Sequence, residues 1–285
     1  MVRKLEATDF RARRMVLEPD DFALTDGKPE PAPTDLVSPK VWHGIMDIAD
    51  DVAIRTTSDQ GSRIGFLYEL WGAWQEAMPT GCIVGYAMRE CSDDFASSIV
   101  SILHGFYRQA VGTLRSALET MVFACLCQLT SGQKIWRAWE SGKEEINFRK
   151  IRHRLRQESG IIALEGRAKA ATGRTMFADK NRPDPGGWAT SLHSHLPNFI
   201  HASGDLSNGR IWESNGPVYS GRGMTISYHS YLETYALLLL LAKIAHPSLP
   251  MPRGADILFA YDSRRRYLRQ PDRRLCGFIK REVFP

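Results

Sequence analysis

The sequence predicts an all-α protein, a helical bundle built around two long apolar helices at about 84–129 and 225–246. Apolar residues recur at spacings of three and four through the middle of the chain, the period of a helix with one buried face. No segment alternates apolar and polar residues as a half-buried strand does. Proline and glycine clusters separate the helical segments, and the 285 residues of the chain can bury a substantial core.

The first 38 residues are rich in proline, aspartate and arginine and show no sustained period. We therefore predict an irregular N-terminal arm over 1–38. A bundle domain follows over 39–250. Its helical pattern starts at Val41 in "VWHGIMDIADDVAIRT", continues in "SRIGFLYELWGAWQEAM" and is broken at Pro79.

The first long helix is predicted to run from about Val84 to Leu129, with a bend near Gly105 or Gly112. Shorter helices are expected at about 133–141, 144–158 and 188–202, the last kinked near Pro197, before the final apolar helix at 225–246.

The positive charge of the chain is concentrated at its end. The whole chain has a formal charge of +5, and the segment from Ser263 to Pro285 alone has +6. We predict a basic C-terminal tail over 251–285 that either contacts RNA or another nucleic acid, or packs on its own bundle through Leu268, Leu275 and Ile279. The predicted nucleic-acid-binding residues are Arg149, Arg152, Arg156, Arg264, Arg265 and Arg266.

Composition excludes several classes of protein. The first residues are charged throughout, and the longest apolar run, Ala236–Ala242, is far shorter than the roughly 20 residues of a membrane span. We therefore expect a soluble cytoplasmic protein that does not bind membranes. The five cysteines form no Cys-x-x-Cys pair, and His193, His195 and His201 have no nearby acidic or cysteine ligand. No metal or other cofactor is expected.

Charged residues run along the first long helix. On one continuous helix, a set of mostly polar residues falls in a sector about 80° wide, and we call this set the polar seam. Its members are Glu90, Asp94, Ser97, Ser101, His104, Arg108, Gly112, Arg115 and Glu119. The seam is either a wet edge or a polar network inside the bundle. For a network, we expect partners after the Pro197 kink or on the last helix; the candidates are His201, Asp205, His229 and Glu233.

The segment "GFYRQAVGTLRSALETMVFACL" contains Leu114, Arg115, Ser116 and Glu119. It resembles the central helix of a bacterial all-helical family of unknown function with the motif Leu-Arg-Ser-x-x-Glu. In that family a histidine closes a later helix, and "LPNFIH" here ends in His201. The resemblance implies a HEPN-like bundle of the kind often found near bacterial stress or phage-defence genes, and it implies no established reaction.

Two functional hypotheses follow. In the first, the chain is a homodimeric binding or regulatory protein in which Arg115, Glu119 and His201 form a network, His104, Arg108 and Asp205 bind a ligand, and the tail contacts a partner, which could be another protein. In the second, it is a metal-independent HEPN-type ribonuclease. There, His201 or His229 is the general base and Arg115 or Arg222 stabilises the phosphorane charge.

Overall fold

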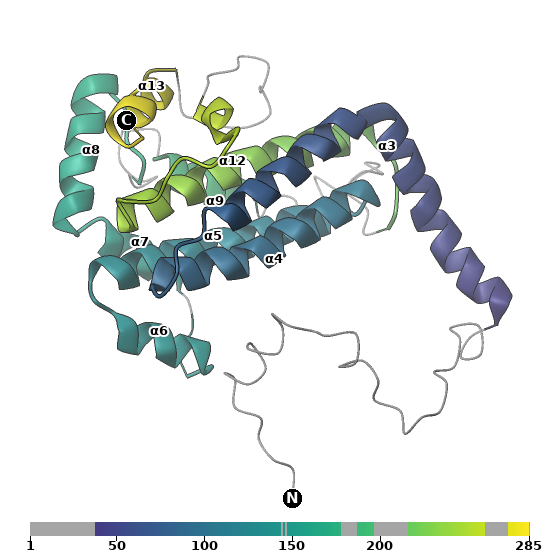
Figure 1. The fold of residues 1–285 in the computed structure, drawn as a ribbon, viewed down its shortest axis with the longest axis horizontal. Coiled ribbons are helices and arrows are strands. Elements are labelled where there is room, and N and C mark those ends of the chain that lie inside the picture. Colours follow the sequence, from purple (N-terminus) through teal and green to yellow (C-terminus); the bar gives the residue numbers. More distant parts are fainter. Residues whose placement is uncertain are drawn as a thin grey trace, which may run out of the picture.

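A computed structural model of the protein describes residues 38–143, 145, 147–177, 187–196, 216–259 and 273–284. Over these residues the chain forms helices and no strand, which confirms the predicted all-α bundle. Figure 1 shows the long helices lying side by side, with the shorter ones packed around one end.

The α-helices of the described residues carry the labels of Figure 1. In chain order they are α3 (Pro39–Glu76), α4 (Ile83–Leu103), α5 (Tyr107–Leu129), α6 (Gln133–Glu140), α7 (Phe148–Leu155), α8 (Ser159–Thr172), α9 (Trp188–His195), α12 (Gly221–Ala245) and α13 (Arg273–Glu282). A 3-10 helix, η3 (Ala255–Phe259), lies between α12 and α13 in the sequence. The last long helix, predicted at 225–246, is α12.

The prediction of one helix from 84 to 129 is wrong, because the chain reverses near Gly105 and forms an antiparallel pair, α4 and α5. Gly105 has a φ of +78°, and a Cβ there would lie 2.5 Å from the backbone oxygen of Val218. The far ends of the pair also meet, since the amide of Ile83 donates to Gln128 Oε1 at 3.2 Å. A close contact with a distant segment therefore replaces the expected bend with a full turn.

The core is built around α12, which packs against α5 and α4 (Figure 1). The two helices α12 and α5 begin together, where the amide of Ser220 donates to the Tyr107 hydroxyl at 3.1 Å. Aromatic rings from three helices then meet in the interior. Phe95 of α4 lies 5.1 Å from Trp74 of α3 and 4.9 Å from Tyr231 of α12, between ring centroids.

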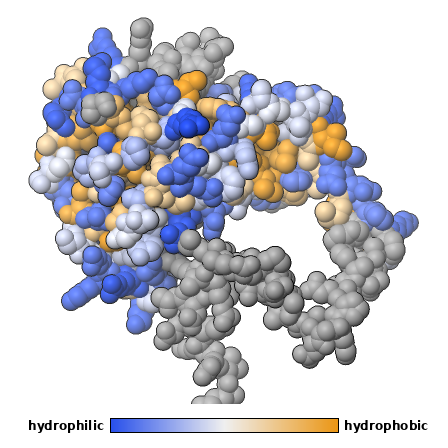
Figure 2. Space-filling view, in the orientation of Figure 1, coloured by the Kyte–Doolittle hydropathy of each residue, from blue (hydrophilic) through white to orange (hydrophobic). Residues whose placement is uncertain are grey.

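The two halves of α3 differ. Gln60 has non-helical backbone angles, so the helix kinks there. The second half packs into the bundle and buries Leu67, Leu70 and Trp74. The first part of α3, residues 39–55, leads away from the bundle (Figure 1), and we call it the α3 extension. Apolar residues reach the surface along α3 (Figure 2).

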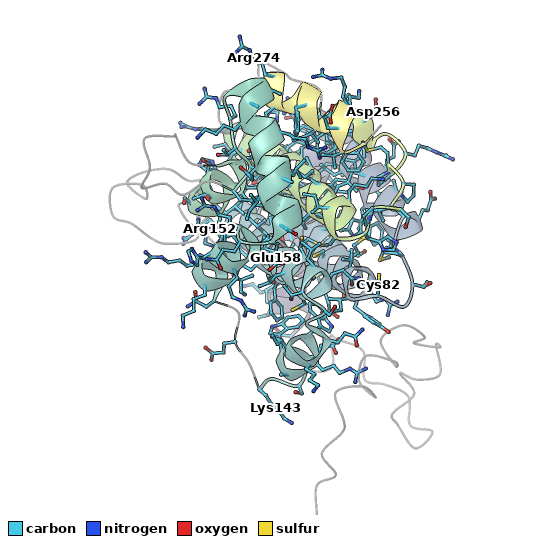
Figure 3. The ribbon with its side chains drawn as sticks, turned by 90° about the vertical axis from the view of Figure 1, so that its left-hand side faces the viewer. Cys82, Lys143, Arg152, Glu158, Asp256 and Arg274 are labelled. Atoms are coloured by element: carbon cyan, nitrogen blue, oxygen red, sulfur yellow. The ribbon has the colours of Figure 1, made fainter. Side chains whose placement is uncertain are left out.

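The C-terminal helix α13 packs against α8 and η3, as the side view shows (Figure 3). Leu275, Phe278 and Ile279 are buried there. This part of the basic segment therefore lies on the bundle. Among the described helices, α5 alone is long and apolar enough to span a membrane by length and composition, and most of that stretch is buried inside the protein.

Candidate functional site

The candidate site is centred on the carboxylate of Glu119. The guanidinium Nε of Arg115, one helical turn earlier on α5, donates to Glu119 Oε1 at 2.9 Å. The ring Nε2 of His193, on α9, lies 3.1 Å from the same oxygen. Because an ionised carboxylate only accepts hydrogen bonds, Nε2 of His193 carries the proton in this contact. One carboxylate oxygen thus joins two helices that are far apart in sequence.

A stacked aromatic ring fixes the orientation of His193. The ring of Phe148, from α7, lies parallel to the imidazole with centroids 3.6 Å apart and an interplanar angle of 3°. Phe148 is itself buried. The imidazole therefore has an apolar neighbour on one face and the carboxylate of Glu119 at its edge, and it cannot rotate away without losing both contacts.

Hydrogen bonds to two neighbouring helices, α12 and α7, hold the short helix α9 in place. The indole Nε1 of Trp188 donates to Glu233 Oε1 on α12 at 2.9 Å, and both residues are buried. Two residues later, Thr190 Oγ1 accepts a hydrogen bond of 3.0 Å from Nη1 of Arg152, on α7. These contacts set the position at which α9 delivers His193 to the site.

The electrostatics of the site favour an ionised Glu119. The hydrogen bond from His193, and after it the bond and charge of Arg115, hold the pKa of Glu119 below its usual value, while partial burial acts in the opposite direction. The side chains of Arg115, Glu119 and His193 are 30%, 27% and 19% exposed. The site is therefore accessible to solvent, and it is neither a wet edge nor a sealed ion pair.

The two nitrogens at the end of Arg115 are available to a ligand. Within the described part of the chain, neither of them has a hydrogen-bond partner. A guanidinium fixed through Nε presents its other edge as a planar fork that matches phosphate or carboxylate oxygens. The arrangement can bind an anion.

The turn at Gly105 divides the polar seam between α4 and α5. Asp94, on α4, faces α5 and accepts a hydrogen bond from the hydroxyl of Ser116. Burial, opposed by that bond and supported by the charges of Glu90 and Asp93, raises the pKa of Asp94 to about 7. The expectation of one continuous seam is therefore wrong, and Asp94 and Glu119 belong to separate polar contacts.

The predicted ligand-binding residues His104 and Arg108 lie on different elements of the structure. His104 ends α4, with its Nδ1 2.9 Å from the backbone oxygen of Val100. Arg108 lies on α5 about two turns, or roughly 10 Å along the axis, before Arg115. His201 and Asp205 lie outside the described residues, as do Arg264, Arg265 and Arg266.

The alternative catalytic pair lies on α12. Arg222 is exposed in its first turn, and His229 is half-buried two turns later. The predicted basic residues Arg149, Arg152 and Arg156 lie on α7 and at its C-terminal end, next to the site. Arg149 is exposed, whereas Arg152 is partly buried by its contact with α9.

The sequence did not identify His193 as the partner of Glu119. The only signal in the sequence is a short predicted helix that carries both His193 and His195, for which no metal site is expected. In the described ranges no group of three or more His, Cys, Asp or Glu side chains is placed to hold a metal ion. Comparisons of the chain with protein-family models, curated proteins and solved structures gave no match.

Proposed function

We propose that the protein is a cytoplasmic binding or regulatory module that takes an anionic group of its ligand at the Arg115–Glu119–His193 site. The observation that carries this proposal is the state of Arg115. Its Nε is fixed on Glu119 while its two terminal nitrogens have no partner among the described residues and the side chain is 30% exposed. This is the preorganised geometry in which arginine binds phosphate or carboxylate.

The neighbouring helix supports an anionic ligand with extended charge. Helix α7 carries three basic residues with exposed side chains, Arg149, Lys150 and Arg154, close to Phe148 at the site. A nucleic acid strand offers repeated phosphates that such basic residues can contact. RNA is therefore the ligand we propose to test first, with the basic C-terminal segment as a further contact.

The wider setting is part of the same proposal. The all-helical fold agrees with the helical bundle that the resemblance around Arg115 and Glu119 implies. The HEPN-like assignment, the link to bacterial stress or phage defence, and a protein partner are proposals that this fold accommodates.

The test is binding of a fluorescent single-stranded RNA of mixed sequence to the whole chain, followed by anisotropy. Arg115→Lys keeps the charge but loses the planar fork, and we expect roughly tenfold weaker binding, as for a lost charge-assisted hydrogen-bond pair. The matched control is Arg137→Lys, because Arg137 is exposed on α6, away from the site. Melting temperatures should stay close to that of the wild type for both variants, because both side chains are partly or fully exposed.

Equal affinities for the Arg115→Lys and Arg137→Lys variants would contradict the proposal, as would a folded wild-type protein that leaves the RNA unbound. Inorganic pyrophosphate, added as a competitor, shows whether the anion alone is recognised. Competition that disappears in the Arg115→Lys variant would support recognition of phosphate at this site.

Metal-independent RNA cleavage is the second candidate. The observation that favours it is the juxtaposition of Arg115 and His193 on one carboxylate. With Nε2 bonded to Glu119, Nδ1 of His193 is the atom that could take the proton of a ribose 2′-hydroxyl, while Arg115 stabilises the charge on the phosphorus oxygens. The measurement is gel-resolved cleavage of an RNA panel. The enzyme hypothesis requires that His193→Gln abolish cleavage while RNA binding is retained, and intact RNA with the wild-type protein would exclude it.

A further inference from the structure

Glu165, on α8, binds the chain shortly after that helix ends. Its carboxylate oxygen Oε1 accepts hydrogen bonds from the backbone amides of Met176 and Phe177, both at 2.8 Å. Met176 and Phe177 are fully buried, and a buried amide needs an acceptor. One half-buried carboxylate therefore fixes the backbone of this segment against α8.

The same segment holds the start of α9. The amide of Ala189 donates to the backbone oxygen of Met176 at 2.8 Å, and the amide of Trp188 donates to the backbone oxygen of Thr175 at 3.3 Å. The first amides of a helix have no acceptor within the helix, so these two bonds satisfy the beginning of α9. Met176 is thus bonded on both sides, through its amide to Glu165 and through its carbonyl to Ala189.

The position of His193 depends on where α9 starts. His193 lies one helical turn after Ala189, on the same face of α9. A displacement of the first turn therefore moves the imidazole away from its stacked ring and its carboxylate partner. The bonds that join α9 to α12 and α7 involve side chains of α9, whereas the bonds to residues 175 and 176 hold its backbone.

We infer that Glu165 is a positioning residue for the Arg115–Glu119–His193 site, acting through Met176 and the start of α9 and not by contact with the ligand. Its effect on ligand binding rests on the proposed function, but its effect on the geometry of His193 is measurable without any ligand. A carboxylate that only stabilised α8 and the chain after it would leave the His193 ring in place, and this difference decides the test.

The test is the NMR spectrum of the His193 ring in the whole chain, with isotope-labelled histidine and without RNA. Because the imidazole stacks on Phe148 with centroids 3.6 Å apart, the ring current of the phenyl group shifts its carbon-bound protons upfield. In Glu165→Ala these signals should move downfield, toward those of an exposed histidine. In Glu165→Gln they should stay close to the wild type, because the amide oxygen can still accept from both backbone amides. The His193→Gln variant identifies the signals.

The matched control is Glu158→Ala. Glu158 stands at the start of the same helix (Figure 3), and its side chain makes no capping hydrogen bond there. The His193 signals of this variant should be those of the wild type. The signals of His104, at the end of α4, report in every variant whether the bundle is folded. If Glu165→Ala does not fold, Glu165→Asp replaces it, since the shorter side chain cannot reach both amides from the same backbone position.

A folded Glu165→Ala protein with unchanged His193 signals would overturn the inference. A Glu165→Gln variant whose His193 signals move as far as those of Glu165→Ala would also overturn it, because acceptance from the two amides would then not be what holds α9.

Binding of the fluorescent RNA separates this inference from the proposed function. If both hold, Glu165→Ala should weaken RNA binding several-fold, because Glu119 loses the hydrogen bond from His193 that helps to orient the Arg115 fork. Displaced His193 signals together with an unchanged RNA affinity would support the positioning role of Glu165 and contradict the proposed role of the site.

Discussion

The α3 extension and helix α12 are both long helices, yet they have opposite surroundings. Helix α12 buries residues on all of its sides, including five consecutive leucines from Leu237 to Leu241. The α3 extension has apolar residues mainly along one strip and buries none of its described side chains. A helix that is apolar all round must lie in the core, whereas a helix with one narrow strip can be satisfied by a single neighbour.

Two glycines, Gly105 in the bundle and Gly44 in the α3 extension, show the same difference in surroundings. Gly105 lies where the α4–α5 turn touches another part of the chain, and a Cβ would approach the backbone of Val218. Around Gly44, in the α3 extension, no atom lies within 4 Å of the position that a Cβ would take. A glycine of the bundle is thus required by packing, and a glycine of the extension is not.

The largest effect is expected from Gly105→Ala. Alanine at φ +78° is strained, and its Cβ would lie 2.5 Å from Val218 O and 2.8 Å from Val218 N, so the turn must move. We expect the free energy of unfolding to fall by about 2–5 kcal/mol, the sum of left-handed strain and overpacking. Urea denaturation followed by circular dichroism measures this.

Gly142→Ala is the control, because Gly142 has a similar φ of +71° but no atom within 4 Å of the added Cβ. It should cost only the strain, about 1–2 kcal/mol. Equal losses in the two variants would show that the contact with Val218 does not hold the α4–α5 turn.

An intermediate effect is expected from Asp94→Asn, and it depends on pH. Because the pKa of Asp94 is raised from 3.8 to about 7 in the folded protein, the folded state binds the proton more tightly than the unfolded chain does. Stability is therefore lost as the pH rises between these two values. Asparagine does not ionise and can still accept from Ser116, so the variant should be more stable by about 1–3 kcal/mol at a pH near 8 and nearly unchanged below about pH 4.

Asp50→Asn makes the same substitution in the exposed α3 extension. It should change the free energy of unfolding by no more than about 0.5 kcal/mol at either pH. A pH-independent gain in the Asp94→Asn variant would instead indicate that charge at this position does not limit stability.

The smallest effect is expected from Gly44→Ala. Alanine favours an exposed helix by about 0.5–1 kcal/mol over glycine, and it meets no atom here. Since the extension can open without the bundle, the gain should appear as a roughly two- to fivefold slower hydrogen exchange of the extension at low protein concentration, with the global unfolding midpoint unchanged. If the global unfolding midpoint of the Gly44→Ala variant rose as well, the extension and the bundle would unfold together.

The sequence predicted helices more reliably than their ends. The periods of three and four identify α3, α5 and α12, because each buries a continuous apolar stripe. The turn at Gly105 was predicted only as a bend, since the residues on both sides continue the same helical period. What reverses the chain is contact with Val218, more than a hundred residues later, and no local pattern carries that information.

The site was predicted in part. Arg115 and Glu119 lie one turn apart on the same helix, so their pairing follows from helical geometry alone. The histidine opposite them could not be chosen from several candidates by spacing. It is His193 because Trp188 bonds to Glu233 and Thr190 to Arg152, which places α9 beside α5.

The sequence by itself thus determined the all-α class, the apolar helices and the local Arg115–Glu119 pair, since these depend on helical periodicity and on neighbours within one or two turns. The tertiary structure decided which histidine meets Glu119, where the α4–α5 pair reverses, and which apolar stripe is left uncovered. These depend on contacts between segments far apart in the chain, and the free energy of such contacts is set only when the whole bundle packs.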